Sequence, residues 1–187
     1  MRVITGKVRG IQLKTPNGML TRPTADRVKE ALFSIIRFDV AGAAVLDLFG
    51  GTGQLGIEAL SQGAKSAIFV DAREEACGLI RENLKRTRLS DFGTVVRCDY
   101  LDYLNRCREK FDIIFLDPPY AEVFLETALK RITEIDILHS GGIIATERPL
   151  GKDLAFRPEG YTRSKDYKYG KTLLAIYRRE DSGNENL

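Results

Sequence analysis

Four aspartates each follow a short apolar run of the sequence. They are Asp47 after AAVL, Asp71 after SAIFV, Asp99 after TVVRC and Asp117 after FDIIFL. If these runs are buried parallel strands, the carboxylates meet at the carboxyl edge of one sheet, where open α/β sheets bind their ligands. A carboxylate after the second strand can accept hydrogen bonds from both ribose hydroxyls, and one after the third from an adenine amino group. The pattern therefore predicts a site for a nucleoside ligand.

A glycine-rich loop, FGGTG from Phe49 to Gly53, directly follows the first of these aspartates. Glycines there let the backbone turn sharply and approach a ligand closely. With Gly56 the loop also spells GxGxxG, the fingerprint of dinucleotide-binding sheets. That fingerprint does not need Asp47, which could bind a cationic group such as the amino group of a methionine moiety, or could simply cap the loop. Asp71 does not decide between the ligands either, because NAD and S-adenosylmethionine both carry a ribose.

The fourth aspartate opens the segment Asp117-Pro118-Pro119-Tyr120. Two consecutive prolines remove two backbone donors and fix the local chain, so neighbouring carbonyl oxygens stay free to accept hydrogen bonds. A carboxylate beside such a carbonyl forms a pair of acceptors suited to an exocyclic NH2 group, and the tyrosine offers a face for stacking a base. A turn that is merely stiffened by proline is the alternative. The aspartates at the preceding strand ends favour chemistry on an amine.

Five apolar runs alternate with four helical patterns between residues 43 and 149, as in a mostly parallel sheet with helices on both faces. The last stretch, YTRSKDYKYGKTLLAIYRR, has two strand-like runs about a YGK turn and predicts a closing antiparallel hairpin. The start of the chain predicts a short β-hairpin arm, followed by a helix over RPTADRVKEALFSII that Thr24 or Asp26 could cap. We expect one domain over residues 1–180, with the arm at 1–20, the helix and core at 21–180, and a polar tail at 181–187.

The composition narrows the class of protein. The chain has 187 residues, of which 43% are hydrophobic and 29% charged, as is typical of one globular domain with a sizeable core. Three cysteines without a CxxC pair and a single histidine, His139, disfavour a disulfide framework, a Cys/His zinc site and a catalytic triad. No apolar run approaches the roughly 20 residues that span a bilayer, and the start lacks the apolar region of a secretory signal. We therefore expect a cytoplasmic protein with reduced thiols, no metal and no membrane contact.

The formal net charge of +3 conceals an uneven distribution. Residues 1–30 carry seven Lys/Arg against two Asp/Glu and residues 148–180 nine against four, a net +5 each, whereas residues 31–147 carry 13 against 18. Two basic ends indicate contacts with nucleic-acid phosphates, with a tyrosine as an additional stacking surface, although solvated surface charge is the alternative. The candidate residues are Arg2, Lys7, Arg9, Lys14, Arg22, Arg27, Lys165, Lys168, Tyr169 and Lys171.

The DLFGGTG, FVD, CD and DPPY series resembles the class I S-adenosylmethionine-dependent methyltransferases that methylate amino groups. With RVITGKVRGIQLKTP, RPTADRVKEALFSII and KYGKTLLAIYRR, the sequence from Arg2 to Arg179 is similar to the bacterial 16S rRNA guanine-N2 methyltransferases of the RsmD type. The glycine loop reads FGGTG where that family has FAGSG, a conservative change. The resemblance implies a Rossmann-like methyltransferase fold and S-adenosylmethionine as cofactor, with S-adenosylhomocysteine as product. It implies that the following residues bind this cofactor: Asp47, Phe49, Gly50, Gly51, Thr52, Gly53, Asp71, Cys98 and Asp99.

The same resemblance implies that the target guanine lies against the catalytic segment Asp117, Pro118, Pro119 and Tyr120. It implies 16S rRNA as substrate, within a small ribosomal subunit or an assembly intermediate. For a small methyltransferase of this architecture we expect a monomer. The alternatives are an amino methyltransferase for another nucleic acid, such as adenine N6 in DNA or RNA, and a non-catalytic RNA-binding assembly factor. The DPPY segment argues against the assembly factor, because a binding module does not need acceptors aimed at an amine. An NAD oxidoreductase is the least favoured alternative.

Overall fold

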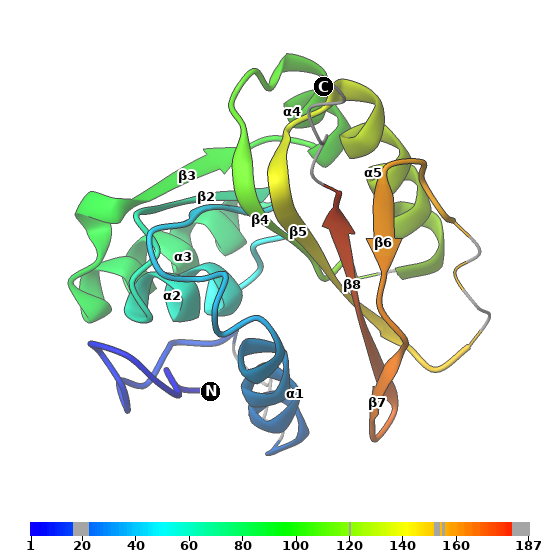
Figure 1. Ribbon diagram of the computed structural model, residues 1–187. Coiled ribbons are helices and arrows are strands. Elements are labelled where there is room, and N and C mark those ends of the chain that lie inside the picture. Colours follow the sequence, from blue (N-terminus) through cyan, green and yellow to red (C-terminus); the bar gives the residue numbers. More distant parts are fainter. Residues whose placement is uncertain (17–22, 120, 152–153, 155, 181–187) are drawn as a thin grey trace.

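A single sheet of eight strands organises the computed structural model, which describes residues 1–16, 23–119, 121–151, 154 and 156–180 (Figure 1). The strand order is β3-β2-β1-β4-β5-β8-β6, and β7 also pairs with β8. The strands are β1 (Ala44–Asp47), β2 (Ser66–Asp71), β3 (Gly93–Arg97), β4 (Phe111–Leu116), β5 (Leu138–Pro149), β6 (Tyr161–Arg163), β7 (Tyr167–Tyr169) and β8 (Thr172–Arg179). The helices are α1 (Pro23–Ile35), α2 (Gln54–Ser61), α3 (Glu74–Thr87), α4 (Tyr100–Arg106) and α5 (Ala121–Ile135), with a 3-10 turn at Ser90–Phe92.

Strands β3, β2, β1, β4 and β5 are parallel, whereas β8 runs antiparallel to β5 and pairs with β6 and β7. The expected mostly parallel α/β sheet with a closing antiparallel hairpin is therefore confirmed. From β1 the chain continues to β2 and β3 on one side of the sheet, and from β4 it continues to β5 on the other side. A topological switch point therefore lies between β1 and β4. Ligands of open α/β sheets bind at the carboxyl side of such a point.

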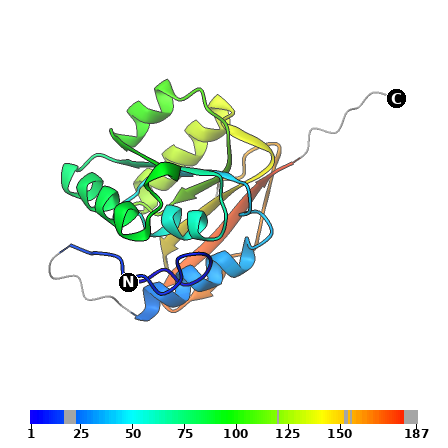
Figure 2. The same cartoon turned by 90° about the vertical axis from the view of Figure 1, so that its left-hand side faces the viewer.

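Helices cover both faces of the sheet, as Figure 2 shows in a view along it. Helices α1, α2 and α3 pack on one face through residues such as Val45, Phe69 and Phe115. Helices α4 and α5 pack on the other face through residues such as Leu46 and Ile114. Since successive strand residues point to opposite faces, the strands read as continuous apolar runs. None of the helices in the described part of the chain is long and apolar enough to cross a membrane.

The predicted N-terminal β-hairpin is reduced to a single antiparallel bridge, between Arg2 and Gln12. The reason lies in α2, whose Glu58 carboxylate accepts hydrogen bonds from the backbone N–H groups of Ile4 (2.9 Å) and Thr5 (2.8 Å). A ladder between two strands would need such donors itself. The segment is thus fixed both by backbone hydrogen bonds of its own, such as Val3 N–H to the carbonyl of Ile11 at 3.0 Å, and by side chains of the core.

The predicted caps of the first helix are also wrong. Helix α1 begins at Pro23, so Thr24 and Asp26 lie inside its first turn rather than before it. Proline suits the first helical position because its missing N–H would have no partner there. Strand β6 was not expected either, since a run of three residues carries little periodicity.

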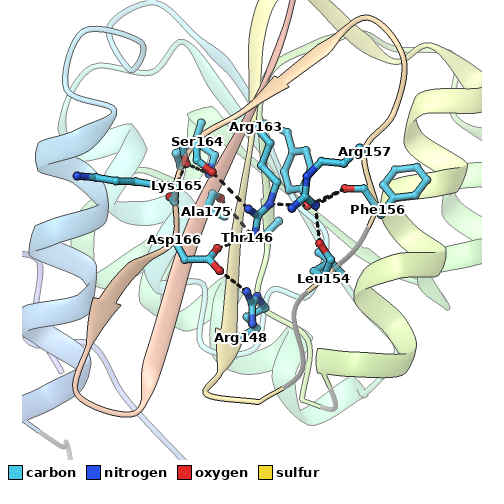
Figure 3. A network of polar contacts seen from close by, with 12 residues as sticks. Thr146, Arg148, Leu154, Phe156, Arg157, Arg163, Ser164, Lys165, Asp166 and Ala175 are labelled. Atoms are coloured by element: carbon cyan, nitrogen blue, oxygen red, sulfur yellow. Dashed lines mark hydrogen bonds and ion pairs between the residues drawn. The ribbon is translucent and has the colours of Figure 1, made fainter.

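A buried polar network fixes the C-terminal strands to β5 (Figure 3). Asp166, between β6 and β7, accepts hydrogen bonds from Arg148 and Arg163, each at 2.6 Å. These arginine side chains are 6% and 9% exposed. Arg163 also donates to the hydroxyl of Tyr177 on β8, at 3.1 Å. Because one carboxylate joins β5 to the start of β7, the network holds β7 beside the carboxyl end of β5.

Candidate active site

A cavity of about 430 Å³ opens at the carboxyl ends of the parallel strands, a volume within the usual range for small-molecule sites. Eleven of the predicted residues line it: Asp47, Phe49, Gly50, Gly51, Thr52, Asp71, Cys98, Asp99, Asp117, Pro118 and Pro119. Gly53 lies behind this wall as the cap of α2, and Tyr120 lies outside the described residues. The residues predicted from the strand ends therefore lie together around one cavity.

Asp47, the last residue of β1, is buried at the floor of the cavity. One of its carboxylate oxygens accepts a hydrogen bond from the backbone N–H of Gly56 at 3.1 Å, so it also caps the first turn of α2. Burial raises the pKa of Asp47 to about 8; the Gly56 hydrogen bond opposes this rise, and the charges of Asp117 and Asp71 add to it. A cationic ligand in the cavity would favour the ionised form of this carboxyl.

The loop after β1 requires glycine at several positions. Gly51 and Gly53 have φ angles of 56° and 78°, in the left-handed region. A Cβ on Gly50 would lie 2.8 Å from Cδ1 of Ile80, because the backbone N–H of Gly50 bonds to the carbonyl of Val70 at 2.8 Å. The loop thus lies tightly against the end of β2 and leaves the cavity open above it.

The carboxylates after β2 and β3 are both held in place by local bonds. Asp71 accepts from the backbone N–H of Gly51 at 3.0 Å and forms an ion pair with Arg73 at 3.2 Å. Asp99 caps α4 by accepting from the backbone N–H of Leu101 at 2.8 Å. A carboxylate has about four lone-pair positions, so Asp99 retains acceptor capacity for a ligand. Asp71 also accepts from the backbone N–H and the guanidinium of Arg73, so ribose hydroxyls would take the place of this exposed guanidinium.

Sequence reasoning missed an aromatic wall of the cavity. The ring centroids of Phe49 and Tyr100 are 5.1 Å apart, and those of Tyr100 and Phe124 are 5.5 Å apart. Tyr100 directly follows Asp99 and could have been found from that position, whereas Phe124 lies within α5 and carries no local signal. Such a wall suits a flat heteroaromatic ring. The other unpredicted lining residues are Met1, Leu48, Gln54, Leu55, Ala72 and Arg73.

Gln54, the first residue of α2, also lines the cavity. Its side-chain oxygen is buried and has no hydrogen-bond partner within the described structure. A buried acceptor without a partner is costly, so a ligand donor is the natural partner for it. Together with Asp47, it gives this end of the cavity acceptors for a cationic, N–H-bearing group.

Asp117 lies at the end of β4, followed by the buried Pro118 and the exposed Pro119. Burial raises the pKa of Asp117 to about 6. On the neighbouring strand β5, burial and the charge of Asp117 raise the pKa of Glu147 to about 8. Glu147 was not predicted, because it lies inside a strand and the sequence does not give the register of β5 against β4.

The basic candidates differ in their surroundings. Lys7, Arg9, Arg27, Lys168 and Lys171 are exposed. In contrast, Arg2 and Lys14 form ion pairs with Asp26 and Glu82, and Lys165 lies 5.6 Å from the ring centre of Tyr167. Tyr169 is partly buried against the core, and Arg22 lies outside the described residues.

Known proteins resemble this chain over nearly its whole length. Residues 1–178 match the model of a family described as Conserved hypothetical protein 95. The Bacillus subtilis protein "Putative rRNA methyltransferase YlbH" is 39% identical over 96% of this chain and 99% of its own. The Haemophilus influenzae "Ribosomal RNA small subunit methyltransferase D" is 33% identical over 95% and 93%. The solved structure of "Putative methyltransferase yhhF" from Escherichia coli has a TM-score of 0.87 at 27% identity, covering 96% of this chain and 98% of that one.

Proposed function

Because this chain belongs to the Conserved hypothetical protein 95 family and its relatives are named as rRNA methyltransferases, we propose that it methylates 16S rRNA. The methyl group comes from S-adenosylmethionine and is transferred to the exocyclic N2 amine of a guanine. One observation carries the proposal: the acceptors of the Asp117-Pro118-Pro119 segment border the same cavity as the carboxylates of Asp47 and Asp71. Acceptors suited to a nucleoside and acceptors suited to an amine thus border one cavity.

The cavity residues fit this cofactor. Asp47 and the oxygen of Gln54 suit the ammonium of its methionine part, Asp71 the ribose hydroxyls, and Asp99 the adenine amino group. The aromatic wall offers a surface for adenine. When bound, S-adenosylmethionine supplies a methyl group already attached to a cationic leaving group.

The protein's task in the reaction is alignment of the amine. The N2 lone pair of guanine is delocalised into the ring and is a poor nucleophile. The Asp117 carboxylate and the Pro118 carbonyl accept the two N2 hydrogens, which favours a pyramidal nitrogen whose lone pair faces the methyl group. As N2 gains the methyl group it would lose a proton to Asp117, which would pass the proton on to water. Correct alignment of two reactants supplies much of the rate.

The RNA approaches from outside the cavity. The target base leaves its stack at a cost of a few kcal/mol, which stacking on Tyr120 would partly offset. Exposed basic residues such as Lys7, Arg9, Arg27, Lys168 and Lys171 contact phosphates without reading sequence. With ribosomal RNA as substrate, we expect the enzyme to act in the cytoplasm, as a monomer, on a small subunit or an assembly intermediate.

Replacement of Asp117 tests the proposal. We expect D117A to lower methyl transfer to 16S rRNA by at least about a hundredfold, the loss usual for one transition-state contact. Binding of S-adenosylhomocysteine, measured by calorimetry, should change little. D102A, which removes an exposed carboxylate from α4, is the matched control and should retain activity. Undiminished radiolabelled methyl transfer by D117A would refute the assignment.

The identity of the methylated nucleoside separates the alternatives. Mass spectrometry of nucleosides from treated 16S rRNA, small-subunit particles, tRNA and DNA should show N2-methylguanosine in the rRNA samples. N6-methyladenosine would indicate the other kind of amino methyltransferase. Absence of any methylated product, with RNA binding intact, would favour an assembly factor. Tighter binding of NAD than of S-adenosylmethionine would indicate an oxidoreductase.

A further inference from the structure

Glu147 lies beside Asp117 at the carboxyl edge of the sheet. In the parallel pairing of β4 with β5, Leu116 is opposite Thr146, so the next residues of the two strands are Asp117 and Glu147. Neighbouring strands are about 4.8 Å apart. Phe115 and the residue opposite it on β5 both pack into the core beneath α1, α2 and α3. Because strand side chains alternate, Asp117 and Glu147 also share this face.

The strand order gives the two carboxyls different neighbours. From β2 through β1 to β4, the edge carries Asp71, Asp47 and Asp117, all of which line the cavity. Glu147 follows on β5, next to Asp117 and outside the cavity wall. If the cofactor occupies the cavity, a base with its amine on Asp117 extends toward β5. Glu147 is then the next polar group along that base.

An aromatic residue continues the same row. Glu147 is opposite Leu174 of β8, and Leu174 is opposite Tyr167 of β7. Tyr167 is partly buried against the same core, so it lies on the face of Glu147. The network of Asp166 with Arg148 and Arg163 fixes β7 in this place (Figure 3). A carboxylate pair with a fixed aromatic neighbour is suited to one edge of a flat base.

We propose that Glu147 is a specificity residue that accepts a hydrogen bond from N1–H of the guanine whose N2 amine lies on Asp117. The inference rests on the proposed function. Guanine presents the donor N1–H next to its N2 amine, whereas adenine presents N1, an acceptor, next to its N6 amine. A neutral carboxyl at this position can form two hydrogen bonds with guanine, through N1–H and O6, but only one with adenine, through N1, which leaves its carbonyl oxygen unpaired. Sites that leave a buried polar group unpaired reject the wrong ligand strongly.

The charges of the pair agree with this division of roles. Two carboxyls in adjacent positions do not both ionise readily. Burial raises the pKa of both carboxyls, and the charge of Asp117 raises the pKa of Glu147 further. Asp117 is therefore the carboxylate that accepts from the amine, and Glu147 is the carboxyl that keeps a proton. Its carbonyl oxygen then accepts from N1–H while its hydroxyl donates to O6, which only guanine possesses.

A base analogue tests the proposal. Small-subunit particles are reconstituted with 16S rRNA that carries either guanine or 2-aminopurine at the methylated position. 2-Aminopurine keeps the N2 amine but lacks the hydrogen on N1 and the oxygen on C6. We expect the wild-type protein to prefer guanine by at least about tenfold in kcat/KM. E147L should lose this preference through a lower rate on guanine, with the rate on 2-aminopurine unchanged.

Two further variants separate specificity from structure. E147Q keeps a carbonyl acceptor and an N–H donor, so it should retain the guanine preference and most of the activity. E126L removes an exposed glutamate from α5 and should change nothing. Calorimetric binding of S-adenosylhomocysteine should be the same in all variants, which shows that the cofactor cavity is intact.

The outcomes are distinguishable from failure of the proposed function. A wild-type protein that transfers no methyl group to guanine refutes the proposed function and this inference with it. A wild-type protein that methylates guanine and 2-aminopurine equally well refutes the role of Glu147 alone, whatever the variants do. An equal loss on both bases in E147L would show a structural role and overturn the proposal.

Discussion

The buried carboxyl of Asp47 caps α2 and also borders the cavity, and this couples ligand binding to protonation. With a pKa of about 8, Asp47 is mostly protonated at pH 7. A cationic ligand stabilises the ionised form, so binding at pH 7 should release up to one proton. The affinity for S-adenosylmethionine should rise as the pH increases toward 8, by up to about tenfold per unit, and level off above it. Calorimetry in buffers of different ionisation enthalpy measures the proton count.

Asp47→Asn is the control for that prediction, because an amide keeps the size and the acceptor toward Gly56 but does not titrate. In this variant the proton release should disappear and the affinity should be weaker and independent of pH between about 6 and 8. Proton release that persists in Asp47→Asn would assign the titration to Asp117 or Glu147 instead.

Individual site residues were predictable where the sequence marks a strand end. Asp47, Asp71, Asp99 and Asp117 each terminate an apolar run, and all four line the cavity. Glu147 lies on β5 level with Asp117, but β5 continues to Pro149, so no strand end in the sequence marks this glutamate. Its position beside Asp117 depends on strand register, which is set by packing between segments 30 residues apart.

Among the elements, the junction of the N-terminal segment with α1 and α2 depends on one buried ion pair. Lys29 and Glu58 are 3.1 Å apart, with side chains 2% and 1% exposed, and Lys29 also donates to the carbonyl of Arg2 at 2.6 Å. Lys29→Met would leave the charge of Glu58 buried without its partner. We expect this change to lower the free energy of unfolding by about 3–5 kcal/mol in urea denaturation.

Two comparisons define what the Lys29→Met result means. The double variant Lys29→Met/Glu58→Gln should be less destabilised than the sum of the single variants, because both charges are gone. Lys110→Met, which breaks an exposed pair with Asp136, should cost less than about 1 kcal/mol. A loss in Lys29→Met no larger than that of Lys110→Met would contradict a structural role for the buried pair.

This junction also shows why the strands and helices of the core could be predicted from the sequence more accurately than the N-terminal segment. The parallel strands and their helices follow from hydrophobic patterns that are local to each segment. The N-terminal segment follows from Glu58, which binds backbone groups of Ile4 and Thr5 from more than 50 positions away. The local pattern therefore predicted the pairing of residues 1–3 with 10–13, but it could not predict the contacts with α2 that limit this pairing to one bridge and a few backbone hydrogen bonds.

For the molecule as a whole, not all of the basic charge counted from the sequence is available to RNA phosphates, because several basic side chains pair with carboxylates. Lys29 neutralises Glu58, and Arg148 and Arg163 share Asp166 in the interior. Arg178 and Arg179 pair with Asp39 and Asp136. Exposed cations remain on the N-terminal segment, α1 and β7, which lie along one side of the molecule in Figure 1. The surface that we propose to contact RNA is thus smaller than the two basic ends of the sequence would indicate.

Salt dependence measures the extent of that surface. Each lost phosphate contact lowers the slope of log K against log salt concentration by about 0.7 to 0.9. The double variants Lys7→Ala/Arg9→Ala and Lys168→Ala/Lys171→Ala should therefore each lower the slope for 16S rRNA by about 1.4 to 1.8, as measured by filter binding. Arg106→Ala/Arg108→Ala removes the same charge near the start of β4, at the edge of the sheet opposite the cavity. If this control lowers the slope equally, RNA responds to net charge alone, and the surface of the N-terminal segment and β7 is no specific contact.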